Sequence, residues 1–165
     1  MFKLTDSQLH EARHAIRSAS ARPDVHSAIA SLYADVQIQI DLRRPLCILS
    51  GRCCRFEEFG HHLYVTTLEL ATFLHDLQSS NASPDPAWTG QGCPFQRNKL
   101  CSVHAIRPFG CRLFFCDSTS TDWQHEQYHL FHTRLKSLHD SLNVPYFYLE
   151  WRQALTIALD LGPIS

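Results

Sequence analysis

Cysteine is the residue type in this chain whose number and spacing point most directly to chemistry. Seven cysteines occur in 165 residues, and they fall into two blocks separated by a long gap. The first block contains Cys47, Cys53 and Cys54, and the second contains Cys93, Cys101, Cys111 and Cys116. Thiolates on irregular segments can turn toward one tetrahedral point, which suits zinc and iron. The pattern therefore predicts a metal site or an iron-sulfur cluster whose ligands come from these seven residues.

The spacing does not select which cysteines are direct ligands. Four thiolates suffice for a zinc ion or for one four-iron cluster, and neither block is a paired CxxC of the zinc-ribbon kind. Cys53 and Cys54 are adjacent, and neighbouring side chains usually diverge, so we expect only one of them to be a direct ligand unless the loop is tightly turned. A single cysteine is more often a small buried hydrophobe, but seven in two blocks favour metal binding.

The surroundings of the cysteines are expected to be reducing. The N-terminal stretch MFKLTDSQLHEARHAIRS lacks the uninterrupted apolar run of an export signal, and no apolar run elsewhere approaches the roughly 20 residues of a membrane span. We therefore expect a soluble, cytoplasmic protein, in which thiols stay reduced unless a metal or a catalytic cycle uses them. A net charge of -1 provides no field that would attract nucleic acid or an anionic membrane. A metal ion and a protein remain as expected partners.

Two arginines of the second block are candidate cofactor-binding residues. Arg107 and Arg112 can donate to cluster sulfurs or to an anionic partner, because a guanidinium keeps its charge and carries several donors. A structural ion pair explains them equally well. Cys111, beside Arg112, is also a candidate reactive thiol, because a nearby cation favours the thiolate.

Several histidines have spacings that a metal site could use. His125, His129 and His132 share one face of a predicted helix, and imidazoles placed in this way can bind a metal of intermediate softness. His61 and His62 form a second candidate pair. A polar, solvated face is the more common explanation for such residues, so the cysteines remain the preferred ligands.

Residues 93–116 read CPFQRNKLCSVHAIRPFGCRLFFC, and this stretch resembles the YkgJ-like cysteine-cluster family. That family is described as zinc- or iron-chelating domains and is similar to part of flagellin lysine N-methylases. The family signature runs C-P-hydrophobic, C-x-hydrophobic-Tyr, then R-P-x-x-C-R-x-F-x-C. On that match the four cysteines of the second block correspond to family cysteines. Arg107, Pro108 and Arg112 correspond to its basic and rigid positions, and His104 stands where tyrosine is common.

The first block matches the same family less closely. The family usually shows C-x-x-C-G-x-C-C, whereas residues 47–54 read CILSGRCC, with Ser50 in place of the second cysteine. A serine hydroxyl is a poor ligand for a soft metal. Either the site needs fewer thiolates than the family offers, or this chain binds a metal differently or not at all. The resemblance covers roughly residues 47–116.

Helical segments must position these residues on the N-terminal side. Apolar residues at helical spacing predict a helix over residues 6–20, with Thr5 or Asp6 at its start. Pro23 suits the first turn of a second helix, which should end near residues 43–44. We expect the two helices to form an antiparallel hairpin over residues 6–45.

The middle of the chain should be less regular. From residue 46 to residue 64 the helical periodicity disappears and glycines accompany the cysteines, as in a ligand-binding loop. Thr66 and Glu69 then have capping-box spacing and predict a helix that ends by Ser80.

Two further helices are expected near the C-terminus. Apolar residues predict a long helix over residues 122–142, and Pro145 should open another, with Tyr148 and Trp151 on its inner face. Gly162 and Pro163 should end it. The aromatic residues of this segment are expected in the core and not in a ligand platform; they are Tyr146, Phe147, Tyr148 and Trp151.

These segments predict a mostly α fold, a small single-domain helical bundle with an irregular cysteine-rich loop region. One domain should span residues 1–165, made of a helical hairpin (6–45), a cysteine-cluster metal-binding region (47–116) and C-terminal helices (122–161). Its length is enough to bury a core without covalent staples.

Three classes of function stay open. The favoured class is a protein that chelates zinc or iron, or holds an iron-sulfur cluster, through its cysteines. The resemblance alone implies a second class, an enzyme or enzyme subunit related to protein lysine N-methylation, but no Gly-rich cofactor loop supports a methyl-donor site. The third class is a structural zinc module for protein-protein interaction.

Overall fold

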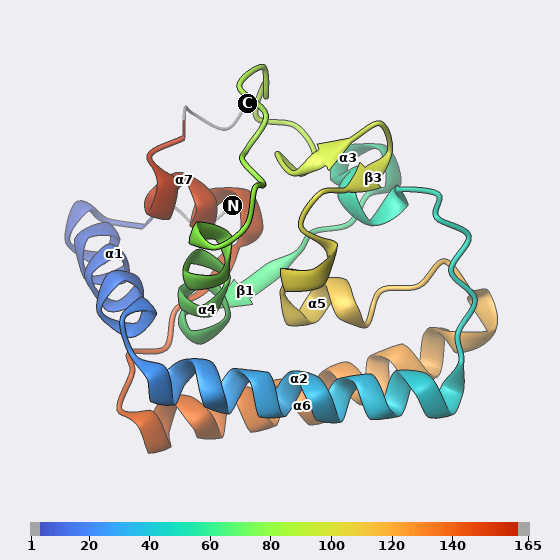
Figure 1. The fold of residues 1–165 in the computed structure, drawn as a ribbon, viewed down its shortest axis with the longest axis horizontal. Helices are drawn as coiled ribbons and strands as arrows, with labels where there is room; N and C mark the ends of the chain where they lie inside the picture. The colour runs from blue at the N-terminus through green and yellow to red at the C-terminus, as the bar shows by residue number, and fades with distance from the viewer. Residues whose placement is uncertain (1–3, 162–165) are drawn as a thin grey trace.

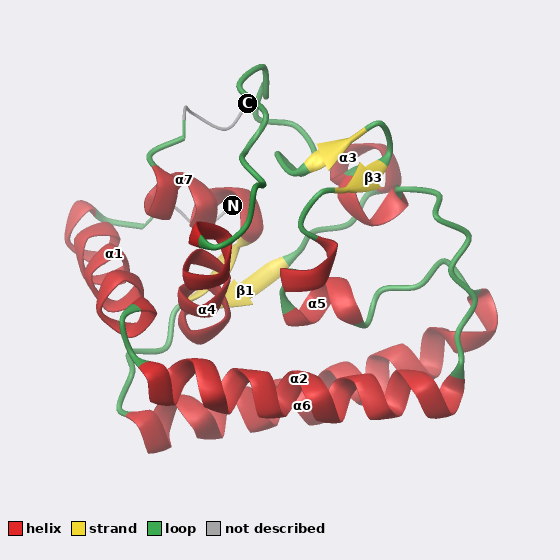
Figure 2. Cartoon of the chain, in the orientation of Figure 1, coloured by secondary structure: helices red, strands yellow, loops and turns green. Residues whose placement is uncertain are grey.

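The computed structural model describes residues 4–161, and this part of the chain is mostly α-helical, as predicted. It contains seven α-helices: α1 (Asp6–Ser20), α2 (Pro23–Arg43), α3 (Phe56–Phe59), α4 (Thr67–Gln78), α5 (Phe109–Arg112), α6 (Thr121–Leu142) and α7 (Trp151–Leu159). Four short strands are β1 (Tyr64–Thr66), β2 (Gln96–Arg97), β3 (Leu100–Cys101) and β4 (Tyr148–Glu150). Single 3-10 turns are η1 (Arg52–Cys54), η2 (His104–Ile106) and η3 (Ser118–Ser120). Figure 2 shows how little of the chain is strand.

The long helices α2 and α6 lie side by side along one edge of the molecule (Figure 1). Helices α1, α4 and α7 pack together at one end, and the cysteine-bearing segments occupy the rest of the fold above α2 and α6. Two apolar clusters correspond to these groups. One contains Ile16, Phe73 and Trp151, and the other contains Ile29 and Phe131. The cysteine region is therefore supported by helices on two sides.

The first two helices begin and end where the sequence predicts. Thr5 caps α1 in a capping box with Gln8, and Pro23 stands in the first turn of α2. They are not each other's main partners, however, because α1 packs chiefly on α4 and α7 while α2 follows α6. The apolar face of each helix selects its neighbour, and the short turn between α1 and α2 allows them to diverge.

The segment after α6 differs from the prediction. Pro145 does not open a helix: the chain there is extended, and β4 pairs antiparallel with β1 before α7 begins at Trp151. Glu150 caps α7 by accepting from the backbone N–H groups of Arg152 and Gln153. The predicted end at Gly162 and Pro163 lies outside the described residues.

The pairing of β4 with β1 changes the exposure of the aromatic run. Trp151 is 1% exposed, but Tyr146 and Tyr148 are 39% and 37% exposed, so the prediction of a core position is wrong for these two tyrosines. Tyr148 is in β4, where successive side chains point to opposite faces, and Tyr146 lies in the chain just before that strand, so a helical face is no guide to burial at either position.

The region expected to be a loop is partly regular. It contains η1, α3 and β1, and α4 follows with the predicted capping box between Thr66 and Glu69. None of the helices within residues 4–161 has the length and apolar character needed to span a bilayer.

Candidate functional site

Hydrogen bonds bring the two cysteine blocks together. The backbone N–H of Cys93 donates to the carbonyl oxygen of Cys54 at 2.8 Å, and the side-chain amide of Gln96 donates to the carbonyl oxygen of Gly51 at 2.9 Å. Gly51 has φ +70, and a Cβ there would lie 2.4 Å from the carbonyl oxygen of Lys99. Only glycine allows the turn η1 to approach the β2–β3 hairpin this closely.

Four thiols from three segments of the chain gather at this junction, and we call them the inner thiols: Cys53, Cys54, Cys93 and Cys101. The Sγ atoms of Cys53 and Cys54 are 4.0 Å apart. The thiols of Cys101 and Cys93 lie close enough to that of Cys54 to raise its pKa. The adjacent Cys53 and Cys54 face the same group because η1 turns tightly, which is the exception that the sequence left open.

The four inner thiols differ in the direction in which their pKa values are shifted. Hydrogen bonds with the thiols of Cys101, Cys53 and Cys93 raise the pKa of Cys54. The reciprocal bonds from Cys54 lower the pKa of Cys53 and of Cys101 to about 7 and also lower the pKa of Cys93. The four groups titrate as a coupled set. Cys54 thus keeps its proton, while its three neighbours approach the thiolate form that binds metals and electrophiles.

Residues of the hydrophobic core lie against the inner thiols. The indole N–H of Trp151 donates to Sγ of Cys93 at 3.4 Å. Phe95, between Cys93 and Cys101 in sequence, is 0% exposed and packs against Phe73. An N–H donor favours a thiolate, and apolar walls limit the access of water. The sequence placed Trp151 in the core but carried no signal for its contact with a cysteine.

Two further residues of the first block and one of the second lie in a different environment, and we call Cys47, Ser50 and Cys116 the outer residues. Cys47 is exposed. The Ser50 hydroxyl lies 3.3 Å from Sγ of Cys116. Ser50 therefore lies next to a cysteine thiol.

A cavity of about 100 Å³ connects the inner thiols with the outer residues. Six of the seven cysteines line it, all except Cys93. His104, Arg107 and Arg112 also line it. The structure thus gathers nearly all of the predicted site residues around one small space.

The two arginines have different roles in this cavity. Arg107 donates to the carbonyl oxygen of His104, and its charge contributes to lowering the pKa of Cys53 and of Cys101. The Arg112 guanidinium lies 4.1 Å from the centroid of the Tyr33 ring. Arg107 is thus the arginine whose positive charge favours ionisation of these two thiols.

The surroundings of Cys111 disfavour the reactive thiolate that its neighbour Arg112 suggested. Burial, followed by the charges of the other cysteines, raises the pKa of Cys111 well above its ordinary value. Arg112 stacks on Tyr33 and donates to the carbonyl oxygen of Ala105, and it does not offset the cost of burial. The raised pKa of Cys111 counts against the prediction from sequence adjacency, which a thiol titration would test.

The inner thiols fit zinc or iron in kind, but they do not stand in a ligand geometry. Within residues 4–161, no three Cys, His, Asp or Glu side chains are placed so that they could hold a metal ion directly. Two thiolates of a tetrahedral zinc site with Zn–S of about 2.3 Å are about 3.8 Å apart, close to the 4.0 Å between Cys53 and Cys54. Metal binding therefore requires the inner thiols to turn toward one point.

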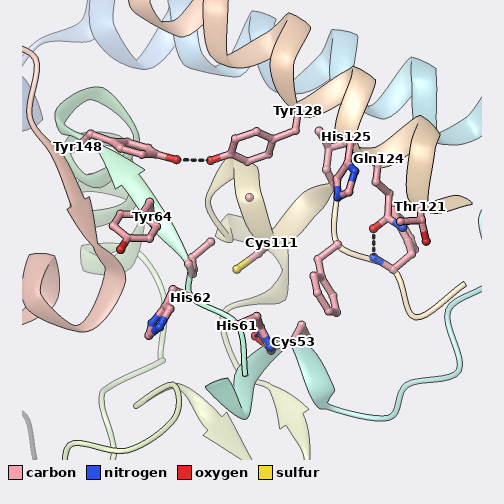
Figure 3. Close-up of a pocket in the computed structure, with 15 residues that line it drawn as sticks. Cys53, His61, His62, Tyr64, Cys111, Thr121, Gln124, His125, Tyr128 and Tyr148 are labelled. Atoms are coloured by element: carbon pink, nitrogen blue, oxygen red, sulfur yellow. Dashed lines mark hydrogen bonds between the residues drawn. The ribbon is translucent and has the colours of Figure 1, made fainter. Parts of the chain in front are cut away.

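A second, larger cavity of about 430 Å³ lies beside the first (Figure 3). Both cavities are lined by Cys53, Cys111, Phe114 and Phe115. Of the histidines considered as ligands, His61, His62 and His125 line this cavity, whereas His132 bonds to the hydroxyl of Tyr146. This space could not be predicted from the sequence, because its walls come from segments far apart in the chain.

The fold and the site define a small, mostly helical protein with a thiol-lined cavity. Comparison with protein-family models, with curated proteins and with solved structures finds no match for the chain. The resemblance to the YkgJ-like family therefore stays a prediction.

Proposed function

We propose that this protein binds a single soft metal ion, zinc or iron, through Cys53, Cys54, Cys93 and Cys101. The observation that carries the proposal is the convergence of these four thiols from three segments, tied together by the backbone bond from Cys93 to Cys54. Four thiols match the donor number and donor type of a tetrahedral site.

The spacing of the inner thiols favours one ion over a four-iron cluster. Cys53 and Cys54 are adjacent in sequence, and their sulfur atoms are 4.0 Å apart. That separation suits two ligands of one ion, whereas a four-iron cluster places each of its cysteines on a different iron. A four-thiolate shell leaves no open position, so the bound ion would supply a crosslink between chain segments and not a reacting centre.

The chain's own residues prepare the thiols for this role. Trp151 donates a hydrogen bond to Cys93, and the charge of Arg107 favours ionisation of Cys53 and Cys101. Closing the four thiols on one point would join η1 to the segment 93–101, and the two are already tied by the backbone bond from Cys93 to Cys54 and by the bond from the Gln96 side chain to Gly51. We therefore infer a structural metal site that stabilises the cysteine region.

The test is anaerobic purification followed by analysis of metal and acid-labile sulfide. We expect about one zinc or iron per chain and no sulfide. Cys54→Ser should reduce metal content to about a tenth or less, because the four-ligand shell is broken. Cys47→Ser is the matched control, since Cys47 is exposed and outside the inner thiols, and it should keep its metal.

Titration of the metal-free chain with cobalt gives a second readout that does not depend on a folded variant. Thiolate-to-cobalt charge-transfer absorption should grow until one equivalent is bound, at an intensity corresponding to four thiolates. Absence of metal in anaerobic protein together with no such absorption would overturn the proposal. Stoichiometric sulfide would overturn the single ion in favour of a cluster.

A further inference from the structure

The larger cavity, which we call the aromatic pocket, is formed by five parts of the chain (Figure 3). It is lined by Cys53 of η1, residues 61–64 at the start of β1, residues of α5 and of the loop after it, the first turns of α6, and Tyr148 of β4. Its volume of about 430 Å³ is within the range of sites for small organic molecules, roughly 300 to 1,000 Å³. A ligand with a single ring or with a fused pair of rings is compatible with this volume.

The walls of the aromatic pocket carry no permanent charge. Among the residues that line it, none is Asp, Glu, Lys or Arg. Moving a polar group from water into such a space without a hydrogen-bond partner costs about 2 kcal/mol or more. Moving an ionised group there costs more still, unless the site supplies a partner charge. The lining therefore selects a ligand that is uncharged at neutral pH.

Aromatic rings make up two of its walls. Tyr64 and Tyr148 stack with centroids 5.2 Å apart, and His61 stacks on Phe114 at 5.0 Å. Tyr64 is 39% exposed, and Tyr148 and Phe114 are each 37% exposed. Exposed ring faces gain most from covering by another flat ring, through burial and through offset or edge contacts.

A pair of phenols supplies the polar group of the aromatic pocket. The hydroxyls of Tyr128 and Tyr148 are 2.6 Å apart. One hydroxyl donates to the other, so the pair retains one O–H donor and several acceptor lone pairs. Burial raises the pKa of both phenols, which keeps them neutral at physiological pH. The pair can bind one oxygen of a ligand in either hydrogen-bonding direction.

We propose that the aromatic pocket binds a neutral, flat aromatic molecule that carries one hydroxyl or carbonyl oxygen, with this oxygen at the Tyr128–Tyr148 pair. The ring of the ligand would cover the exposed faces of Tyr64 and Phe114 and would lie against Cys53 and Cys111, which line both cavities. The inference does not depend on a bound metal ion.

The probe for the test is 2-naphthol, which is flat, neutral at pH 7 and has one hydroxyl. Calorimetric titration of the full chain should show saturable binding of about one equivalent. The comparator is 2-naphthoate, which has the same rings with an anionic group. We expect it to bind about tenfold more weakly or worse, because its charge has no partner in the aromatic pocket.

A matched pair of variants on α6 locates the site. His125 lines the aromatic pocket (Figure 3), whereas His129, one turn further along α6, does not. Both side chains are exposed, so replacing either should preserve the fold. His125→Trp fills the space and should weaken 2-naphthol about tenfold or more, while His129→Trp should change Kd by less than about twofold.

Tyr128→Phe examines the polar contact separately. It removes one hydroxyl of the pair, and we expect about three- to tenfold weaker binding of 2-naphthol, the range for one lost neutral hydrogen bond. The proposal is overturned if 2-naphthol does not saturate, if 2-naphthoate binds equally well, or if the two tryptophan variants weaken binding to the same extent. An unchanged affinity in Tyr128→Phe would overturn the placement of the ligand oxygen.

Discussion

The inner thiols and the outer residues come from the same two blocks of sequence, but their surroundings differ. The inner thiols rest on Trp151 and Phe95, and backbone bonds join their segments. The outer residues lie beside a segment whose Leu46, Ile48 and Leu49 are between 61% and 69% exposed. Spacing within a motif therefore does not decide which cysteines meet. Support from the core decides it.

The largest expected effect concerns the core beneath the inner thiols. Phe95→Ala removes a ring that is 0% exposed, and it should lower the free energy of unfolding by about 3 to 5 kcal/mol. Leu100→Ala, in the same hairpin but at a side chain that is 55% exposed, should cost less than about 0.5 kcal/mol. Urea denaturation measures both. If the two variants lost similar amounts of unfolding free energy, the buried ring of Phe95 would not support the inner thiols more than the exposed side chain of Leu100 does.

A second prediction concerns α5, which carries Cys111 in the wall between the two cavities. Glu69 accepts from Thr66 and from the N–H of Phe109 at the start of α5, and burial raises its pKa from 4.5 to about 7. Because the folded state holds this proton more tightly, the stabilisation is complete below pH 4.5 and is lost as the pH rises through 7. The shift corresponds to about 3 kcal/mol.

Glu69→Gln should abolish this pH dependence, since an amide does not titrate. The measurement is the free energy of unfolding of both proteins between pH 4.5 and 8, expressed as the difference between them. A difference that stays constant over this range would show that Glu69 is ionised in the folded protein with an ordinary pKa, and that its burial does not control α5.

Two glycines with similar backbone angles allow the cost of the left-handed conformation to be measured apart from the cost of a steric clash. Gly51 and Gly60 have φ +70 and +63, but a Cβ at Gly60 meets nothing within 4 Å, whereas at Gly51 it meets Lys99. Gly60→Ala should cost about 1 kcal/mol, from the left-handed conformation alone. Gly51→Ala should cost about 2 kcal/mol more, because η1 must move away from the hairpin. Thermal denaturation checks both, and equal costs would mean that the hairpin yields freely.

The smallest expected effect is on the outer side. Ser50→Ala removes the contact with Cys116 and a bond from the N–H of Arg52, and it should cost about 1 kcal/mol or less. Metal content should not change, because Ser50 is not one of the inner thiols. Loss of metal in this variant, measured beside the unaltered protein, would show that the outer residues take part in the site.

Several parts of the fold could be predicted because their signals are local. Capping boxes at Thr5 and at Thr66, and a proline in the first turn of α2, mark helix starts within a few residues of where they act. The strands β1 and β4 could not be predicted in this way. Each has three residues, too few for an alternating pattern, and each exists because a distant segment pairs with it. The error at Pro145 and the unexpected exposure of Tyr148 both follow from that pairing.

The sequence by itself determined the chemical types available to this protein: seven thiols, the arginines near them and the helices that hold them apart or together. Only the tertiary structure decided that Cys53, Cys54, Cys93 and Cys101 form one group and that Cys47 stands outside it. The physical reason is the distance along the chain between the residues that interact. Caps and helical faces act over three or four residues, whereas the bond from Cys93 to Cys54 and the approach of Gly51 to Lys99 join segments that are distant in the chain.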